Sequence, residues 1–210
     1  MMRREVLAPG AVVLRGFADE VASDLADAVH CVVSQAPLRH MVVPGGHRMS
    51  VAITNCGALG WVSDTTGYRY MSLDPLSGLA WPPLPASFRT LAQRAADAAS
   101  FAGFVPDACL VNRYTPGTRL SLHQDKDEQD YDAPIVSVSL GIPAVFLFGG
   151  LRRADKTTRV PVLHGDVVVW GGPARLRYHG VATVGMACHP VLGEQRINLT
   201  LRKAGPAIHP

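Results

Sequence analysis

Short β-rich runs separated by turn residues fill the second half of the chain, and they constrain its fold more than any other feature. About eight such runs lie between residues 105 and 203, a spacing typical of β-sandwiches and jelly rolls. The runs are Cys109–Tyr114, Leu120–Asp125, Ile135–Leu140, Val145–Phe148, Arg159–Leu163, Val167–Trp170, Arg177–Ala182 and Arg196–Arg202. We therefore predict a jelly roll, in which two sheets pack face to face, over residues 105–203.

The first half of the chain contains two segments with helical periodicity. Apolar side chains recur at helical spacing over residues 20–34 and again over residues 86–101. Asp19 is the expected N-cap of the first helix, and a short strand is expected at residues 11–14. The fold class is thus mainly β, with helices that flank the β-rich half.

A long irregular segment, residues 37–85, connects the two predicted helices. It is rich in Gly, Pro, Ser and Thr, and it carries Trp61 and Trp81 with Tyr68 and Tyr70 nearby. Structureless segments of this length inside a compact domain usually serve a function, because ordering them costs conformational entropy and they contribute little to the hydrophobic core. We predict that residues 37–85 contact a ligand.

Composition indicates one ordered enzyme domain, residues 1–210. Hydrophobic residues make up 48% and charged residues 18%, which argues against disorder. The net charge of +3 is compatible with a polyanionic partner without demanding one. The four cysteines form no C-x-x-C pair, and no apolar run approaches the ~20 residues of a membrane span. We expect a monomer in the cytoplasm, with no membrane contact.

A possible metal site begins with His123 and Asp125. Side chains two residues apart share one side of a strand, so this pair presents an imidazole and a carboxylate together. His179, in a later β-like run, would complete a two-histidine, one-carboxylate set with open metal positions, as non-haem Fe(II) oxygenases require. The pair alone is a weak signal, since any single histidine is more often a surface or satisfied polar residue.

The last predicted strand, residues 196–202, alternates strictly between polar and apolar side chains. Arg196, Asn198, Thr200 and Arg202 share one face, and three aliphatic residues share the other. Alone, this pattern also describes an ordinary amphipathic strand with its arginines in solvent. Together with the three candidate ligands, it predicts an inward polar face that binds an anionic co-substrate, as in a dioxygenase that uses Fe(II), 2-oxoglutarate and O2. The apolar outer face is then expected to be covered by the helices.

Seven sequence blocks, which together extend over nearly the whole chain, resemble the AlkB family of alkylated-DNA repair dioxygenases. The blocks are Pro44–Gly46, Thr54–Trp61, Asn112–Gly117, Leu120–Glu128, Ile135–Gly141, His164–Gly171 and Arg196–Thr200. The resemblance is specific because the blocks occur in order. It implies a double-stranded β-helix, which is a jelly roll, preceded by a nucleotide-recognition lid within residues 37–85.

The resemblance also implies a role for individual residues. Fe(II) would be bound by His123, Asp125 and His179. The co-substrate 2-oxoglutarate would be bound by Asn112, Tyr114, Arg196, Asn198 and Arg202, with its far carboxylate at Arg196 and its metal-proximal side at Arg202. Trp61 and Tyr68 would sandwich or contact the damaged base, and Asp127 would lie beside it. The candidates for contact with nucleic-acid phosphates are Arg48, Lys126, Arg152 and Arg153. The chain departs from the family at Val43, His47 and Ile53, which puts details of the lid and its base preference in doubt.

The implied reaction is oxidative demethylation of bases of the 1-methyladenine and 3-methylcytosine type. It is coupled to 2-oxoglutarate decarboxylation and releases formaldehyde, succinate and CO2. The implied partner is alkylated single- or double-stranded DNA, with RNA as an alternative. A base in a duplex must first be flipped out or come from a single strand.

Two alternatives remain open on sequence grounds. The chain could be a relative that acts on RNA, a protein or a small molecule, although Trp61, Tyr68 and Asp127 favour a nucleobase. It could also be a jelly-roll binding module without turnover, although such a module commonly loses one of the ligands or arginines. Metal analysis with an assay for succinate separates an enzyme from a binding module.

Overall fold

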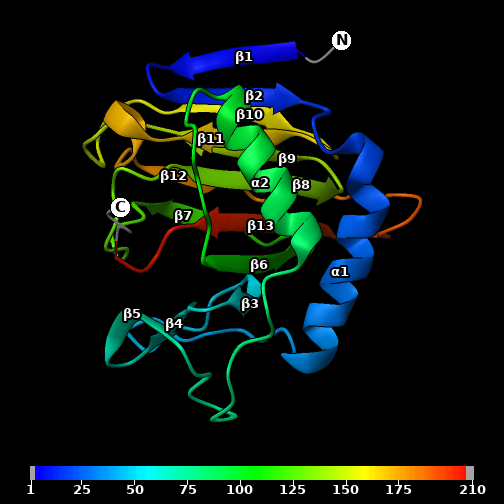
Figure 1. Ribbon diagram of the computed structural model, residues 1–210, viewed down its shortest axis with the longest axis vertical. Helices are drawn as coiled ribbons and strands as arrows, with labels where there is room; N and C mark the ends of the chain where they lie inside the picture. Colours follow the sequence, from blue (N-terminus) through cyan, green and yellow to red (C-terminus); the bar gives the residue numbers. More distant parts are fainter. Residues whose placement is uncertain (1–2, 207–210) are drawn as a thin grey trace.

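The computed structural model describes residues 3–206, which form two sheets, a β-hairpin and two α-helices (Figure 1). The larger sheet has the strand order β1 (Arg3–Ala8), β2 (Ala11–Arg15), β11 (Val167–Trp170), β8 (Ile135–Gly141), β13 (Arg196–Arg202), β6 (Ala108–Tyr114) and β3 (Ala52–Gly57). The smaller sheet has the order β10 (Thr158–Val162), β9 (Ala144–Phe148), β12 (His179–Val181) and β7 (Leu120–His123). The hairpin consists of β4 (Gly60–Asp64) and β5 (Gly67–Met71).

The two helices, α1 (Ala22–Gln35) and α2 (Ala86–Ala98), lie on the same side of the larger sheet (Figure 1). Leu199 and Leu201 of β13 pack there in one apolar cluster with Leu25 of α1 and Leu91 of α2. Each such side chain contributes roughly 1.5–3 kcal/mol when it leaves water. The prediction that helices cover the apolar face of residues 196–202 is therefore confirmed.

The opposite face of the larger sheet packs against the smaller sheet. Ile135 and Trp170 of the larger sheet join Phe146 and Phe148 of the smaller one in a second apolar cluster. Two antiparallel sheets packed in this way form the predicted jelly roll, so the fold class is confirmed. The space between the sheets is where the polar face of β13 points.

Each of the eight predicted β-rich runs overlaps an observed strand, although several bounds differ. The run at residues 177–182 shrinks to β12, because the amide of Arg177 donates to the Ala174 carbonyl in a turn. The run at residues 120–125 ends at His123, which leaves Asp125 just beyond the strand. Strand β1 was not predicted, and residues 37–85, expected to be irregular, contain β3, β4 and β5.

The prediction that Asp19 caps the first helix is wrong. Residues 19–21 form a 3₁₀ turn, and α1 begins at Ala22 after Val21, without a side-chain capping bond. The carboxylate of Asp19 instead packs against Gly165, a left-handed glycine (φ +80) where a Cβ atom would collide with it. The side chain therefore serves a turn contact rather than the helix.

The second helix is shorter than the predicted segment 86–101 because the chain turns after Ala98. Ser100 adopts a left-handed conformation (φ 72), which ends the helical path. Within residues 3–206, no helix is both long and apolar enough to cross a membrane.

Candidate metal and co-substrate site

A cavity of about 820 Å³ opens between the inner faces of the two sheets and the β4–β5 hairpin. Its lining includes the twelve residues predicted to bind metal, co-substrate or substrate, which are His123, Asp125, His179, Asn112, Tyr114, Arg196, Asn198, Arg202, Trp61, Tyr68, Asp127 and Arg153. These side chains come from both sheets, the hairpin and two loops. The fold therefore brings together residues that are far apart in the sequence.

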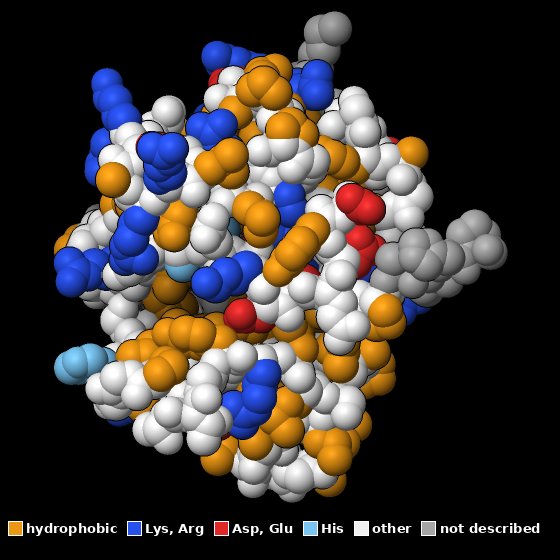
Figure 2. Space-filling model, turned by 90° about the vertical axis from the view of Figure 1, so that its left-hand side faces the viewer, with side chains coloured by type: hydrophobic (Ala, Val, Ile, Leu, Met, Phe, Trp, Pro, Cys, Tyr) orange, Lys and Arg blue, Asp and Glu red, His pale blue; other side chains and the backbone are white. Residues whose placement is uncertain are grey.

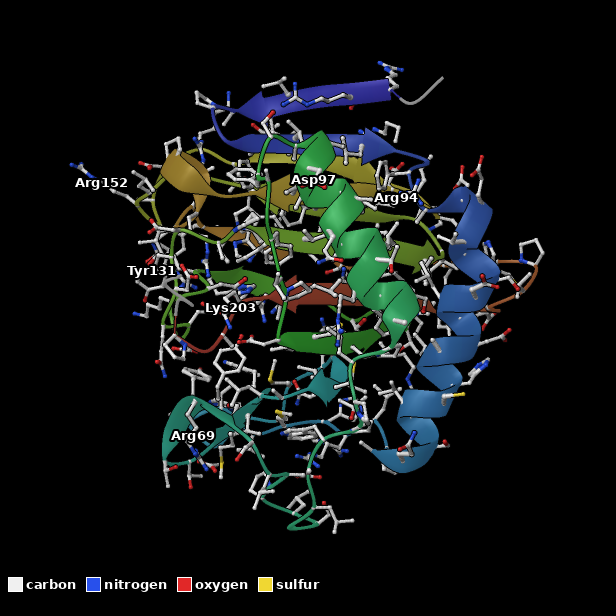
Figure 3. All side chains as sticks on the ribbon, viewed as in Figure 1. Arg69, Arg94, Asp97, Tyr131, Arg152 and Lys203 are labelled. Atoms are coloured by element: carbon white, nitrogen blue, oxygen red, sulfur yellow. The ribbon has the colours of Figure 1, made fainter. Side chains whose placement is uncertain are left out.

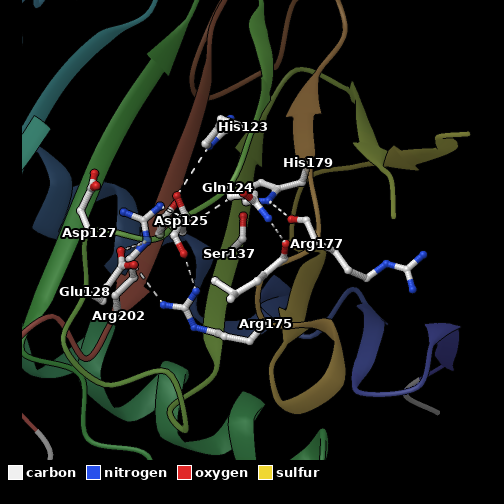
Figure 4. A network of polar contacts seen from close by, with 12 residues as sticks. His123, Gln124, Asp125, Asp127, Glu128, Ser137, Arg175, Arg177, His179 and Arg202 are labelled. Atoms are coloured by element: carbon white, nitrogen blue, oxygen red, sulfur yellow. Dashed lines mark hydrogen bonds and ion pairs between the residues drawn. The ribbon is translucent and has the colours of Figure 1, made fainter. Parts of the chain in front are cut away.

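Three potential metal ligands meet at one end of the smaller sheet (Figure 4). His123 of β7 lies opposite His179 of β12 in the strand register, and Asp125 follows directly after β7. His123 Nε2 lies 3.6 Å from Asp125 Oδ1, and His179 Nε2 lies 3.4 Å from Asp125 Oδ2. The ligand atoms of the three residues lie within 4.8 Å of one another, close enough to bind a single ion.

Backbone contacts fix which imidazole nitrogen faces the carboxylate. Nδ1 of His123 lies 2.9 Å from the Ser121 carbonyl, and Nδ1 of His179 lies 3.0 Å from the Arg177 carbonyl. A carbonyl only accepts hydrogen bonds, so each Nδ1 carries the proton and each Nε2 keeps a lone pair for a metal. Burial, together with the neighbouring His179, lowers the pKa of His123 to about 4, which keeps its ring neutral.

Asp125 is ionised in this setting. Burial opposes its charge, but the guanidinium of Arg202, which donates to the carboxylate, outweighs burial and holds the pKa of Asp125 well below its usual range. The site thus offers two imidazole nitrogens and one carboxylate, which are N and O donors without a thiolate. This donor set fits Fe(II) with open coordination positions.

Arg196 is a buried cation with unused hydrogen-bonding capacity. Its Nη2 donates to Ser139 Oγ at 2.9 Å, whereas its Nε and Nη1 have no partner among the described residues. The hydroxyl of Tyr114, whose ring lies 4.9 Å from the guanidinium carbon, is also without a partner. Because unpaired buried donors are costly, the surroundings of Arg196 suit a carboxylate that accepts two hydrogen bonds.

Arg202 lies on the same strand face but already has its anionic partners. Its Nη2 donates to Asp125 Oδ2 at 2.8 Å, and its Nε lies 3.4 Å from Glu128 Oε1. Although burial opposes the charge, Asp125, Tyr70 and Glu128 together raise the pKa of Arg202 above its usual value. The two arginines therefore differ: Arg202 neutralises protein carboxylates, and Arg196 is available to a ligand.

Amide and hydroxyl groups lie along the cavity between the two arginines. Asn198 pairs with Asn112 across β13 and β6, and Asn112 Nδ2 donates to Asn198 Oδ1 at 3.3 Å. Asn198 Nδ2 donates in turn to Ser137 Oγ at 2.8 Å. These neutral polar groups can orient a polar ligand without adding charge to the site.

An aromatic pair forms the rim of the cavity on the side of the hairpin. The rings of Trp61 and Tyr68 stack with centroids 5.6 Å apart, and Trp61 Nε1 donates to Asp127 Oδ2 at 2.9 Å. A base inserted between two rings needs roughly 7 Å, which is two ordinary contact distances. In this arrangement a base does not fit between the two rings, so the outer faces of the pair are the ones on which a base can stack.

Basic side chains gather beside the opening, where Figure 2 shows Lys and Arg side chains above an apolar rim. Arg48, Lys126 and Arg153 line the cavity, whereas the exposed Arg152 does not and points outward (Figure 3). The residues at which the chain departs from the family, Val43, His47 and Ile53, also line the cavity.

Sequence reasoning missed several polar residues around the site, above all Glu128, Arg175 and Ser139. Glu128 and Arg175 are almost fully buried and form an ion pair at 3.1 Å. Glu128 stands three positions after Asp125, which places an acid near the site but does not reveal that it is buried. Nothing in the local sequence marks Arg175, whose partner is 47 positions away.

A jelly roll with a two-histidine, one-carboxylate cluster beside an unsatisfied buried arginine defines a class, the non-haem iron oxygenases that use a keto acid. Comparison with known proteins agrees. The family model of the 2OG-Fe(II) oxygenase superfamily matches residues 10–202. The chain belongs to this superfamily and is a dioxygenase that uses Fe(II), 2-oxoglutarate and O2.

More similar relatives identify the family within this class. The chain is 60% identical to the alpha-ketoglutarate-dependent dioxygenase AlkB of Salmonella typhimurium, over 96% of this chain and 93% of the relative. It is 56% identical to AlkB of Escherichia coli, over 96% and 94% of the two chains. The solved structure of OsALKBH1 superimposes with a TM-score of 0.83 at 28% identity, covering 96% of this chain and 100% of that one. The chain is a member of the AlkB family.

Proposed function

We propose that this enzyme repairs alkylated DNA by oxidative removal of methyl groups from base nitrogens, as in 1-methyladenine and 3-methylcytosine. The observation that carries the proposal is the juxtaposition of an aromatic platform, Trp61 with Asp127, and the His123–Asp125–His179 cluster in one cavity. The similarity to AlkB dioxygenases over nearly the whole chain supports it.

In this proposal, Nε2 of His123, Nε2 of His179 and the carboxylate of Asp125 hold Fe(II). The bound metal and co-substrate supply the oxidation of an N-methyl group by O2, with release of formaldehyde, succinate and CO2. The protein binds the reactants next to one another and excludes water from them. The neutral imidazole of His123 needs no deprotonation before it binds metal at neutral pH.

The far carboxylate of 2-oxoglutarate would accept hydrogen bonds from Nε and Nη1 of Arg196 and from the Tyr114 hydroxyl. This pairing satisfies the three polar groups of Arg196 and Tyr114 that lack a hydrogen-bond partner among the described residues. Asn112 and Asn198 would orient the keto-acid end, and Arg202 would keep Asp125 in place beside it. The co-substrate would then lie along the polar face of β13 toward the metal.

The methylated base would stack on the face of Trp61 that Tyr68 does not cover. Asp127 has one carboxylate oxygen engaged by the Trp61 indole, and the other would accept a hydrogen bond from the exocyclic amino group of the base. Arg153, with Arg48 and Lys126, would contact phosphates of the same strand. A methylated base that cannot pair is cheaper to flip, so single strands and damaged duplexes both become substrates.

Methylated oligonucleotides test the proposal and its nearest alternative. The enzyme is incubated with Fe(II), 2-oxoglutarate, O2 and one sequence carrying 1-methyladenine, made as single-stranded DNA, duplex DNA and RNA. We expect the methyl group to disappear from the DNA, as measured by mass spectrometry. Succinate without a change in any oligonucleotide contradicts the proposal, and repair of the RNA alone moves the substrate to RNA. The monomeric state and the cytoplasmic location stay predictions.

A further inference from the structure

The hairpin that carries Trp61 also carries a side chain that reaches the ion pairs behind the metal site. Tyr70 of β5 lies opposite Trp61 in the hairpin register. Its hydroxyl donates to Glu128 Oε1 at 2.7 Å and accepts from Arg202 Nη1 at 3.3 Å. Hydrogen bonds therefore connect the hairpin to the ligand cluster, and both elements line the same cavity.

Glu128 is held from two sides and keeps a fixed position. Its Oε2 accepts from Arg175 Nη2 at 3.1 Å, and its side chain is only 2% exposed. Arg175 also donates to the backbone carbonyls of Asp125 at 2.8 Å and Ala133 at 3.1 Å. Arg175 and Glu128 thus tie the loop after β7 together (Figure 4).

Arg202 transmits this arrangement to the candidate metal ligand. It lies between Glu128 and Asp125, and its 2.8 Å hydrogen bond holds the same Asp125 oxygen that faces His179. The other oxygen of Asp125 faces His123. The rotation of the Asp125 carboxylate, which decides where its ligand atom points, therefore depends on the position of Arg202.

We propose that Tyr70 is a positioning residue for the metal site: its hydroxyl acts through Glu128 and Arg202 to orient the Asp125 carboxylate, which couples the hairpin to metal affinity. This inference rests on the proposed metal site. Because Trp61 and Tyr70 are paired residues of one hairpin, the platform for the base and the orientation of the metal ligand share one support. By linkage, a base that shifts this hairpin and a metal that fixes Asp125 affect each other's binding equally.

Removal of the hydroxyl should disturb this path without changing the packing of the ring. In Tyr70→Phe, Glu128 Oε1 loses its 2.7 Å donor and keeps only Arg202, so the buried carboxylate draws Arg202 away from Asp125. Loss of a hydrogen-bonding partner behind a metal ligand typically weakens metal binding 10–100-fold. We expect a loss near the lower end, about tenfold, because Arg202 and Asp125 both remain.

The test is an anaerobic titration of the full chain with Co(II), which accepts the same N and O donors and needs no turnover to be detected. Wild type, Tyr70→Phe and the control Arg69→Gln are compared. Arg69 is the neighbour of Tyr70 on β5, and its ion pair with Asp64, at 2.7 Å, stays within the hairpin. We expect about tenfold weaker Co(II) binding for Tyr70→Phe and wild-type affinity for Arg69→Gln.

Two further variants make the outcome decisive. Glu128→Gln keeps the size of the side chain but removes its charge, and should also weaken Co(II) binding about tenfold. If Tyr70 acts through Glu128, the double variant binds no more weakly than Glu128→Gln alone. Should Tyr70→Phe fail to fold, Glu128→Gln alone must show the loss.

The possible failures can be told apart. Wild-type affinity in Tyr70→Phe, or an equal loss in Tyr70→Phe and Arg69→Gln, overturns the positioning role and leaves the proposed function untouched. Wild-type protein that binds no Co(II), or binds it equally well after Asp125→Ala, overturns the metal site on which the inference rests.

Discussion

Arg196 and Arg202 lie on the same face of one strand, yet their surroundings give them different chemistry. Arg202 contacts two carboxylates, whereas Arg196 contacts a serine hydroxyl and the face of a tyrosine ring. A buried cation without an anion is unfavourable, so an anionic ligand gains the most binding free energy by pairing with Arg196. The alternating pattern placed both arginines on one strand face, and only the resemblance assigned the far carboxylate of the co-substrate to Arg196 and the metal-proximal side to Arg202.

Replacement of Arg196 by leucine should raise the KM for 2-oxoglutarate steeply. Truncation of one partner of a buried charged pair costs ~2–5 kcal/mol, which corresponds to a KM increase of roughly 30-fold or more. The metal-free protein should lose little stability, because leucine also removes a buried charge that lacks an anion. Arg196→Lys serves as the control that keeps the charge but loses the planar donor pair. An unchanged KM in Arg196→Leu moves this role to another residue.

The metal-free protein should become less stable as the pH falls from about 6.5 toward 4. The pKa of His123 is about 4 in the folded chain and near the ordinary value of 6.5 when unfolded, so the unfolded state binds more protons in this window. The side chain is 35% exposed, so we expect the contribution to stay below about 1 kcal/mol. Urea unfolding at pH 7 and pH 5 measures this change in the free energy of unfolding. In His123→Asn the difference between the two pH values should be smaller than in wild type, and an equal difference excludes His123 as its source.

For the strands, periodicity predicted which side chains share a face but not which strands pair with one another. The alternation over residues 196–202 correctly predicted one buried polar face and one face covered by helices. The register that sets His179 opposite His123 joins strands 56 positions apart, so no local pattern reveals it. Likewise, Tyr70 contacts Glu128 across 58 positions. The spacing of His123 and Asp125, together with the resemblance, supplied the ligand set, whereas the supporting contacts could be identified only from the fold.

Trp61, on the hairpin β4–β5, should affect the substrate separately from the co-substrate. Stacking on an aromatic ring is worth roughly 1–3 kcal/mol per base, so Trp61→Ala should slow demethylation of a methylated oligonucleotide about 10–100-fold. Succinate formation without nucleic acid should change little, because Trp61 lies at the rim and Arg196 lies on β13. Trp61→Phe tests the platform alone, since it keeps a ring but loses the bond to Asp127. Equal losses of both activities in Trp61→Ala would identify the residue as structural core.

At the scale of the whole molecule, a modest net charge hides a local concentration of basic side chains. The chain carries only +3, but six Lys and Arg residues line the cavity that also contains the metal cluster, and four of them lie outside β13. A polyanionic strand releases condensed counterions when it binds such a surface, so affinity depends on salt. Composition alone therefore underestimated how strongly the position of these charges favours nucleic acid.

Adjacent arginines on the β9–β10 connection provide a matched test of this surface. Arg153 lines the cavity, whereas Arg152 does not. Arg153→Ala should weaken binding of methylated single-stranded DNA and lower the slope of log K against log salt by about 0.7, the value of one lost phosphate contact. The slope for Arg152→Ala should be closer to the wild-type slope than the slope for Arg153→Ala is. Equal slopes for Arg153→Ala and wild type contradict a phosphate contact at Arg153.

One cavity is proposed to couple the breakdown of 2-oxoglutarate to the repair of a base. To test this coupling, the anaerobic complex of enzyme, Fe(II), 2-oxoglutarate and a 1-methyladenine oligonucleotide is mixed with O2, and succinate, formaldehyde and restored adenine are quantified. We expect equal amounts of the three products from wild type and none from Asp125→Ala. Succinate without formaldehyde or restored adenine, or undiminished products from Asp125→Ala, rules the coupling out.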